Sequence, residues 1–332
     1  PSAKAAAMPR PVTLAILSDI HYAGPAERAR GEDYEHRDIR NPLLRHAFHA
    51  YRHFIWMRRP LSHAPQLDRF LREAPEVDYV IANGDYSCSS AFVGLSDDAS
   101  FQSAAECIGK LRARFGAKLQ LVFGDHELGK LSFIGQRGGM RLAGWPRCVD
   151  ELGIKPFWQI AAGRYVLMGV TSSLVALPLF SADILPEEKP EWERLRARHL
   201  EEIRSAFAAL PADRRVLLFC HDPTALPFLG REESVRARLP QIEQTIIGHL
   251  HSNLYLWKSR LLAGMPAIHV LGPTAKKLSS ALNEAKHWRP FRVRLCPSLA
   301  GIELLKDGGY FTVKLDPAAQ QPAEFQFHRL KR

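Results

Sequence analysis

The chain has 332 residues, 46% of them hydrophobic, which is enough for one large or two ordinary domains. No run approaches the ~18 apolar residues of a membrane-spanning helix, and residues 1–11, expected to be disordered or vector-derived, lack the apolar segment of a signal peptide. The formal net charge of +10 indicates an anionic partner: a membrane surface, a nucleic acid or a polyanionic small substrate.

The cysteines favour a reducing compartment. Their number is odd, they are widely scattered, and none forms a Cys-x-x-Cys pair: Cys88, Cys107, Cys148, Cys220 and Cys296. This pattern argues against a disulfide framework and against a thiolate zinc site. We therefore expect a cytoplasmic protein, with peripheral contact at the inner face of the membrane as a further expectation.

The first part of the chain contains a strand and a basic amphipathic helix. An apolar run predicts a strand at residues 12–17, and a polar loop follows at 24–40. Asn41-Pro42 is typical of a helix start. From residue 43 to 57, apolar side chains at helical spacing form a stripe, while Arg45, His49 and Arg52 occupy the opposite face. This helix either covers the sheet and caps a site, or lies in a membrane interface and receives an acyl chain.

The remaining elements follow from hydrophobic periodicity. Further strands are predicted at residues 77–82, 118–123, 165–170, 215–219, 266–271, 309–315 and 324–327. Helices are predicted at residues 66–73, 104–115 and 191–210. A glycine-rich loop at 128–144 carries Arg137 and Arg141, which either reach a phosphate or are solvated.

The positive charge is concentrated in two segments. Residues 40–63 and 276–294 each carry a net charge of +5, which together equals the excess of the whole chain. The second segment also contains Trp288 and Phe291. It either joins the first segment in one basic, apolar-lined rim, or is a surface helix followed by a loop.

Acidic and imidazole side chains follow five apolar runs, at the points where the predicted strands end. These residues are Asp19, His21, Asp85, Asp125, His126, His221, His249 and His251. In open α/β sheets, the carboxyl ends of the strands form the edge where sites lie. Carboxylates and imidazoles together suit divalent cations such as Mn²⁺, Fe²⁺, Zn²⁺ or Co²⁺.

The order of these motifs carries a resemblance to a known family. Asp19-x-His21, Gly84-Asp85, Gly124-Asp125-His126-Glu127, a lone His221 and Gly248-His249-x-His251 follow one another along the chain. This series resembles the signature of the calcineurin-like metallophosphoesterases over about residues 12–255. The resemblance implies an α/β (α+β) fold, a four-layer αββα sandwich, in one domain at 12–328. Residues 24–64 and 276–298 would then be inserts, the first a helical basic one.

The resemblance also implies a dinuclear site and its ligands. One metal would bind Asp19, His21, Asp85 and His251, and the second would bind Asp85, Asp125, His221 and His249, with Asp85 bridging. Mn²⁺ is the expected metal, and Fe, Zn and Co are alternatives. The pair of ions would turn a bridging water into a nucleophilic hydroxide. His126 would stabilise the transition state or protonate the leaving group.

Asp125 departs from the family pattern, which has Asn at this position. An Asn amide gives its oxygen to a metal and its N–H to a phosphate oxygen, whereas an ionised Asp only accepts hydrogen bonds. The extra negative charge lies where an anionic substrate approaches. We expect Asp125 to bind metal while weakening substrate binding or turnover.

The motifs predict the reaction class and leave the substrate open. The basic aromatic insert favours an amphiphilic substrate, and the closest resemblance is to the UDP-2,3-diacylglucosamine pyrophosphatases of lipid A biosynthesis. Candidate substrate-binding residues are Arg45, Arg52, Arg137 and Arg141. The alternatives are a soluble nucleotide or cyclic-nucleotide phosphodiesterase, and an attenuated phosphoesterase fold that serves as a binding scaffold. A nucleic-acid partner is not expected, because the charge follows amphipathic faces rather than a groove, and nothing predicts an oligomeric state.

Overall fold

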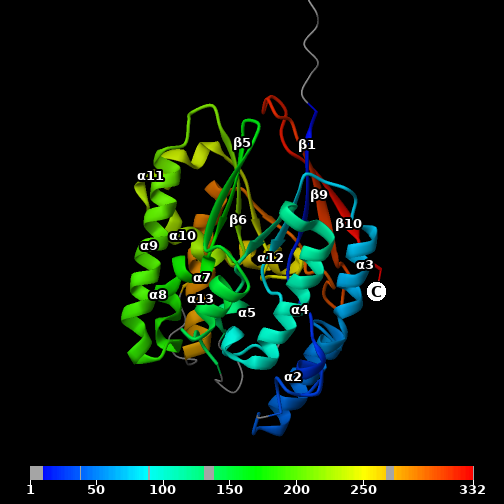
Figure 1. Cartoon of the computed structure of the whole chain (residues 1–332). Helices are drawn as coiled ribbons and strands as arrows, with labels where there is room; N and C mark the ends of the chain where they lie inside the picture. The colour runs from blue at the N-terminus through cyan, green and yellow to red at the C-terminus, as the bar shows by residue number, and fades with distance from the viewer. Residues whose placement is uncertain (1–9, 38, 89, 131–137, 267–272, 332) are drawn as a thin grey trace, which may run out of the picture.

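Two five-stranded sheets packed face to face form the centre of the molecule (Figure 1). The computed structural model describes residues 10–37, 39–88, 90–130, 138–266 and 273–331. The first sheet has the order β10 (Glu324–Arg329), β9 (Gly309–Leu315), β1 (Val12–Leu17), β2 (Tyr79–Asn83), β3 (Leu119–Val122). The second sheet has the order β4 (Phe157–Ala162), β5 (Tyr165–Val170), β6 (Arg215–Cys220), β7 (Ile242–Ile247), β8 (Val293–Leu295).

Strand direction brings several carboxyl ends to one edge of the sandwich. In the first sheet β1, β2 and β3 are parallel. Next to them, β9 is antiparallel to β1, and β10 at the edge is antiparallel to β9. In the second sheet β5 to β8 are parallel, and β4 is antiparallel to β5. Each parallel set therefore directs the loops after its strands toward the same side.

Alternating side chains along the strands divide the apolar core into layers. On β1, Leu14 and Ile16 lie between the two sheets, where they belong to one cluster with Leu217 and Phe219 of β6. Ala15 and Leu17, on the other face of β1, pack toward helices of the outer layer. This period of two is what a strand buried on both faces requires. The predicted four-layer αββα sandwich is confirmed.

Two helical layers complete the sandwich. The first sheet is covered by α3 (Ala64–Glu73) and α4 (Asp98–Phe115), and the second by α9 (Lys189–Ala208) with α11 (Glu233–Arg238) (Figure 1). Shorter helices are α1 (Pro25–Arg28), α5 (Asp125–Leu128), α6 (Gly144–Pro146), α7 (Ser172–Val175), α8 (Leu177–Phe180) and α10 (Leu226–Leu229). Within the described ranges, no helix combines the length and the apolar composition needed to cross a bilayer.

The first insert forms α2 (Pro42–Phe54), which projects from the lower end of the molecule (Figure 1). The Asn41 side chain accepts hydrogen bonds from the backbone N–H groups of Leu43 and Leu44, so it caps the helix as its sequence predicts. Arg52, predicted on the face opposite the apolar stripe, is not exposed to solvent. Arg52 is 4% exposed and pairs with Glu35 of the preceding loop.

The end of α2 is attached to the body by two sets of contacts. The Tyr51 hydroxyl lies 2.7 Å from that of Tyr255, on α12 (Asn253–Leu261). The backbone N–H groups of Glu303 and Leu304 donate to the carbonyls of Trp56 and Ile55. The insert is therefore anchored close to the loop that follows β7.

The second basic segment is part of the core. It continues from α13 (Pro273–Glu284) through a 3₁₀ helix, η9 (Ala285–Phe291), into β8, which pairs with β7. Trp288 and Phe291 are buried in the apolar cluster beneath the second sheet. Neither the expected rim nor the expected loop describes this segment, because its aromatic residues pack inward and its last residues extend the sheet.

The other differences concern element boundaries and two strands. Neither β4 nor β8 was predicted, whereas α4 begins at Asp98 rather than at residue 104. The strand predicted at residues 266–271 falls almost wholly on 267–272, outside the described residues.

Candidate active site

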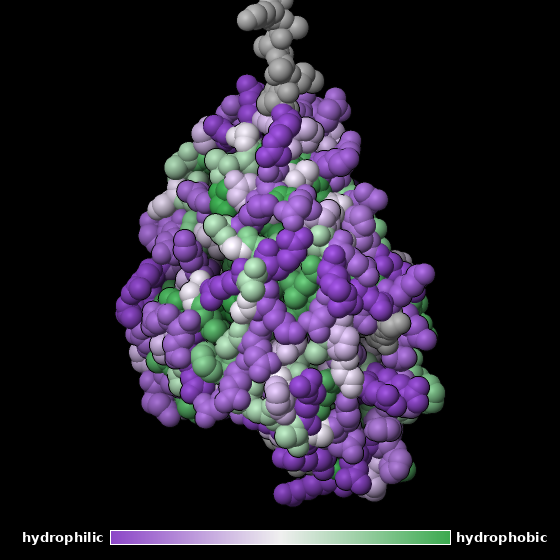
Figure 2. Space-filling view, turned by 45° about the vertical axis from the view of Figure 1, so that its right-hand side comes forward, coloured by the Kyte–Doolittle hydropathy of each residue, from purple (hydrophilic) through white to green (hydrophobic). Residues whose placement is uncertain are grey.

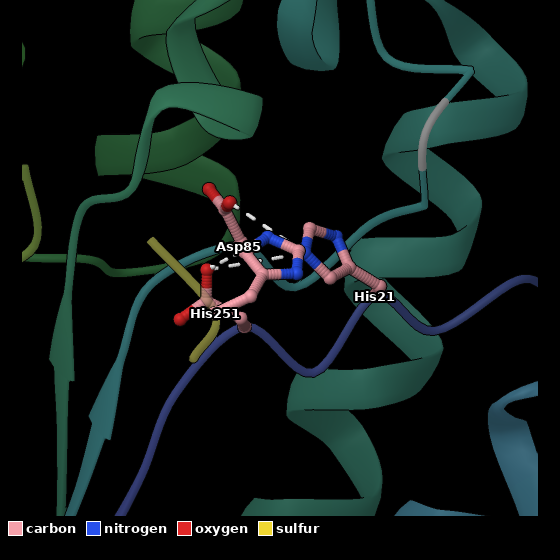
Figure 3. Close-up of side chains that lie close together, drawn as sticks. His21, Asp85 and His251 are labelled. Atoms are coloured by element: carbon pink, nitrogen blue, oxygen red, sulfur yellow. Dashed lines mark hydrogen bonds and ion pairs between the residues drawn. The ribbon is translucent and has the colours of Figure 1, made fainter. Parts of the chain in front are cut away.

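The seven predicted metal ligands lie together at the edge where the two sheets end. Asp19 and His21 follow β1, Asp85 follows β2, and Asp125 begins α5 directly after β3. From the second sheet, His221 follows β6, whereas His249 and His251 follow β7. Figure 3 shows the side chains of His21, Asp85 and His251 converging from three separate segments.

Five of these seven residues have left-handed backbone conformations. The φ values are 48° for Asp19, 48° for His21, 59° for Asp85, 55° for His249 and 59° for His251. Only three other non-glycine residues in the described ranges have positive φ. Residues other than glycine adopt this conformation at an energetic cost, and such strain concentrates at functional sites. The backbone is bent here to aim side chains at a common point.

Glycines beside the ligands leave room for this convergence. A Cβ at Gly84, whose φ is +89°, would lie 2.7 Å from Gly124 Cα. A Cβ at Gly124 or at Gly248 would collide with the Asp85 carboxylate or the Ser18 hydroxyl, respectively. The Gly-Asp and Gly-His motifs therefore contain glycine because the neighbouring chain segments touch.

The first group of ligands comprises Asp19, His21, Asp85 and His251. One ligand atom from each lies within 4.8 Å of the others. His21 Nδ1 is 3.3 Å from the Ser87 carbonyl, so a proton on Nδ1 donates there and Nε2 presents its lone pair to the group. His251 Nε2 is 3.1 Å from His21 Nε2 and 3.2 Å from Asp19 Oδ1.

The second group comprises Asp125, His221 and His249, whose ligand atoms also lie within 4.8 Å of one another. His221 Nδ1 donates to the Asn83 carbonyl at 2.5 Å, which leaves Nε2 facing Asp125 Oδ1 at 3.3 Å. Asp85 Oδ2 lies 3.3 Å from the same Nε2 and 3.9 Å from His21 Nε2. Asp85 therefore stands between the two groups, as the predicted bridging ligand must.

The donor set fits two divalent cations. Asp19 Oδ1 and His221 Nε2 are fully buried, and neither has a hydrogen-bond partner among the described residues. A buried polar atom without a partner is costly, and a cation would satisfy both of these atoms. Carboxylate oxygens and imidazole nitrogens, without thiolates, are ligands for Mn²⁺, Fe, Co or Zn.

The charges of the site shift its pKa values in both directions. Burial alone would lower the pKa of His249, but Asp222 and Asp125 raise it to about 10. Burial likewise opposes the shift at His221, whose pKa is raised above its ordinary value by Asp85 and Asp19. Burial raises the pKa of Asp19 to about 7 although His221 works against it. Protons on His221 and His249 thus balance carboxylates that metal ions would otherwise neutralise.

His126 lies beside the ligands with a defined tautomer. Its Nδ1 donates to the Cys88 carbonyl at 2.8 Å, so its Nε2 accepts from Lys130 Nζ, also at 2.8 Å. The same Nε2 is 3.8 Å from Asp85 Oδ2. The proton between these two side chains is therefore on Lys130, and His126 holds that lysine in place.

Three of the residues that shape the site were not predicted to do so. Lys130 is half-buried and lies against His126. Glu35 connects it to the insert, lying 3.9 Å from Lys130 Nζ while pairing with Arg52. Trp56 stands against His251, with the ring centroids 4.5 Å apart. Lys130 and Glu35 lie in polar loops without periodicity, so the only available signal was charge in a segment near the ligands.

Glu127, the last residue of the third motif, bonds to the backbone of two loops. Its carboxylate accepts hydrogen bonds from the backbone N–H groups of Asp85, Tyr86 and Gly124, at 3.1, 2.9 and 2.6 Å. It therefore ties the loop after β2 to the loop after β3.

The described members of the predicted substrate-binding arginines have different surroundings. Arg141 donates to the carbonyls of Gly138 and Asp183, and Arg45 is exposed on α2. Arg52 is buried in its pair with Glu35. Arg137 lies outside the described residues. Their contact with substrate stays a prediction.

We predict that metal binding releases protons well above pH 6.5. Because the pKa of His249 is raised to about 10, its ring carries a proton at pH 7.5 that a cation must displace, and the raised pKa of His221 acts in the same direction. Mn²⁺ affinity of the metal-free protein should rise with pH toward about 10. Calorimetry at pH 7.5 in buffers of different ionisation enthalpy measures the released protons.

A variant that tests the cause of this proton release is Asp222→Asn, which removes a charge that raises the pKa of His249. This variant should release fewer protons at pH 7.5. Affinity that levels off near pH 6.5 in the unaltered chain would contradict the prediction.

Comparison with known proteins agrees with the geometry. The family model described as calcineurin-like phosphoesterase matches residues 12–253. No curated protein matches the chain. Among solved structures, a phosphopantetheinyl hydrolase from Mycobacterium tuberculosis is 16% identical, with a TM-score of 0.37, over 73% of this chain and 84% of that one.

A purple acid phosphatase from yellow lupin (Lupinus luteus) seeds is 11% identical, with a TM-score of 0.35. The match covers 74% of this chain and 39% of that one. Neither similarity is close enough to carry an argument about substrate. The family match covers most of the chain and includes the seven convergent residues as far as His251. The chain therefore belongs to the calcineurin-like phosphoesterase family and is a metal-dependent phosphoester hydrolase.

Proposed function

We propose that the chain uses two divalent cations, with Mn²⁺ as the first choice, to hydrolyse a phosphoester or pyrophosphate bond in an amphiphilic nucleotide-lipid. A UDP-diacylglucosamine is the model for such a substrate. The observation that carries the proposal is the pair of ligand groups that meet at Asp85. One group would hold each cation.

Two such cations lower the pKa of a water molecule and neutralise charge on phosphoryl oxygens. The residues of the chain supply the rest. The Lys130 ammonium, held by His126 at 2.8 Å, offers a proton and a positive charge close to the leaving group. The Cys88 carbonyl fixes the His126 tautomer, so the ring keeps accepting from Lys130.

Exposed apolar residues on elements that adjoin the site support the amphiphilic substrate. We define an apolar rim as the exposed apolar residues of α2, α12 and the loop after β8: Leu43, Leu44, Phe54, Trp257, Leu261, Leu262, Leu304 and Leu305. On α12, Trp257 and Leu261 are one turn apart and so share a face, beside Lys258 and Arg260. Figure 2 shows apolar residues set among hydrophilic ones over the projecting lower end.

Such a surface suits an acyl chain or a lipid interface that carries anionic groups. Trp56 connects the rim with the site, because it contacts both His251 and Tyr255 of α12. We therefore also propose peripheral contact with the inner face of a membrane.

The primary test is hydrolysis of bis-p-nitrophenyl phosphate with Mn²⁺, followed through release of p-nitrophenol. Asp85→Asn should lower kcat/KM by about 10²-fold or more, because both ligand groups lose a shared charge. Asp213→Asn, on the surface far from the site, is the charge-matched control and should leave the rate unchanged. No metal-dependent turnover by the unaltered chain would refute the proposal.

Asp125 favours a second candidate, an attenuated enzyme or binding scaffold. Its Oδ1 is 3.0 Å from His249 Nδ1 and 3.3 Å from His221 Nε2. Burial raises its pKa, but these imidazoles outweigh burial and hold the pKa well below the ordinary value. The centre thus contains three carboxylates, and a fixed negative charge faces the incoming phosphate.

We predict that Asp125→Asn raises turnover about tenfold, which corresponds to about 1.4 kcal/mol of transition-state stabilisation. The amide keeps a metal-ligating oxygen, removes one charge and adds an N–H donor. Steady-state kinetics, with the metal content measured in parallel, separates a change in turnover from a change in metal occupancy. Equal or lower turnover at equal metal content would show that the carboxylate does not limit the reaction.

The amphiphilic substrate is tested with a panel of UDP-diacylglucosamine, cyclic nucleotides and simple monoesters. We expect the lipid to give the highest kcat/KM. Leu261→Asp should reduce that value about tenfold or more, because burying a leucine side chain against the bound acyl chain contributes about 1.5–3 kcal/mol. Ala208→Asp, which adds the same charge at an exposed position of α9, is the control.

Co-sedimentation with anionic liposomes at low salt provides the second measurement. Binding that weakens in Leu261→Asp and not in Ala208→Asp supports the rim. If cyclic nucleotides are the best substrates and liposomes do not bind, the soluble phosphodiesterase is the correct alternative.

A further inference from the structure

A third cluster of metal-binding residue types lies outside the two groups described above. Asp33 and His36 belong to the loop before α2, and His49 lies on α2 itself. One ligand atom from each lies within 4.8 Å of the others. His36 Nε2 is 3.0 Å from Asp33 Oδ1, and the rings of His36 and His49 are 5.5 Å apart at their centroids.

His36 is the buried member of this cluster. It is 5% exposed and packs against Phe48, whose ring centroid is 5.7 Å from its own. Its Nδ1 is buried, and none of the described residues forms a hydrogen bond with it. A neutral imidazole that donates through Nε2 to Asp33 keeps a bare lone pair on Nδ1, and the opposite tautomer strands the N–H. Either form leaves a buried polar atom unsatisfied, which is costly.

We propose that Asp33, His36 and His49 form a third cation site, which takes one zinc ion with water in the fourth position. Two imidazoles and one carboxylate are ligands that zinc binds at about 2.0–2.2 Å in a tetrahedral arrangement. The side chains of Asp33 and His49 are exposed, so they can turn toward a common centre without disturbing the core. The buried side chain of His36 would keep its position.

The electrostatics around His36 keep it in the form that binds metal. Burial lowers its pKa, and His49 and Arg45 lower it further while Asp33 opposes them. The ring is therefore neutral near pH 7, and only neutral imidazole ligates. The positive charge of Arg45, one turn before His49, has a second effect, because it repels a bound cation and lowers the affinity of the site.

A cation here would fasten the loop to the projecting helix. Leu43 at the start of α2 is 81% exposed, and the contacts between α2 and the body described above are made by its last residues and those that follow. Asp33 and His36 flank Glu35, which pairs with Arg52 and lies 3.9 Å from Lys130 Nζ. Zinc would therefore also hold Glu35 in its position beside the lysine at the active site.

The test measures zinc stoichiometry, because it does not depend on activity. The metal-free full-length chain is titrated with zinc alone and examined by native mass spectrometry. His49→Asn changes an exposed residue and should bind one equivalent of zinc fewer than the unaltered chain. His46→Asn, on the same helix and exposed, is the matched control and should bind as many as the unaltered chain.

Hydrogen exchange gives an independent measurement on the same proteins. Zinc should slow exchange in residues 31–54 of the unaltered chain and of His46→Asn, and should not do so in His49→Asn. Equal zinc stoichiometry in all three proteins would overturn the proposal. Zinc-dependent protection of this segment that persists in His49→Asn would also overturn it.

Discussion

The structure depends on bringing carboxylates from one sheet against imidazoles from the other. Asp19, Asp85 and Asp125 follow strands of the first sheet, whereas His221 and His249 follow strands of the second. Buried carboxylates repel one another, so this edge is stable only when positive charge lies among them. Protons supply that charge on the imidazoles, and divalent cations supply it better. The edge where the two sheets meet is therefore also the place where cations would bind.

The convergence of these seven side chains was predictable because its signals are local. Each ligand follows an apolar run within a few residues, and strands that run the same way deliver such residues to one edge. The glycines beside Asp85 and His249 added a second signal, since they mark segments that touch. The four-layer fold followed from the same runs together with the family resemblance.

The rest depends on contacts that no local pattern contains. Helical periodicity placed Arg52 on the face opposite the apolar stripe, yet the side chain is buried and pairs with a loop carboxylate, Glu35. Lys130 lies in a glycine-rich loop, and only the folded chain shows that it donates to His126. The aromatic residues of η9 resembled a surface rim because the amphipathic pattern cannot say which structure the apolar face meets. In each case tertiary packing decided the outcome.

One chain of polar contacts runs from the insert into the candidate active site. Arg52 pairs with Glu35, Glu35 lies beside Lys130, and Lys130 donates to His126. The insert is consequently not an exchangeable module. A cap grafted from a relative in place of residues 24–64 would bring its own specificity surface, yet it would leave the lysine without its counter-ion. Recombination between relatives should therefore preserve the cap and the loop containing Lys130 as one inherited unit.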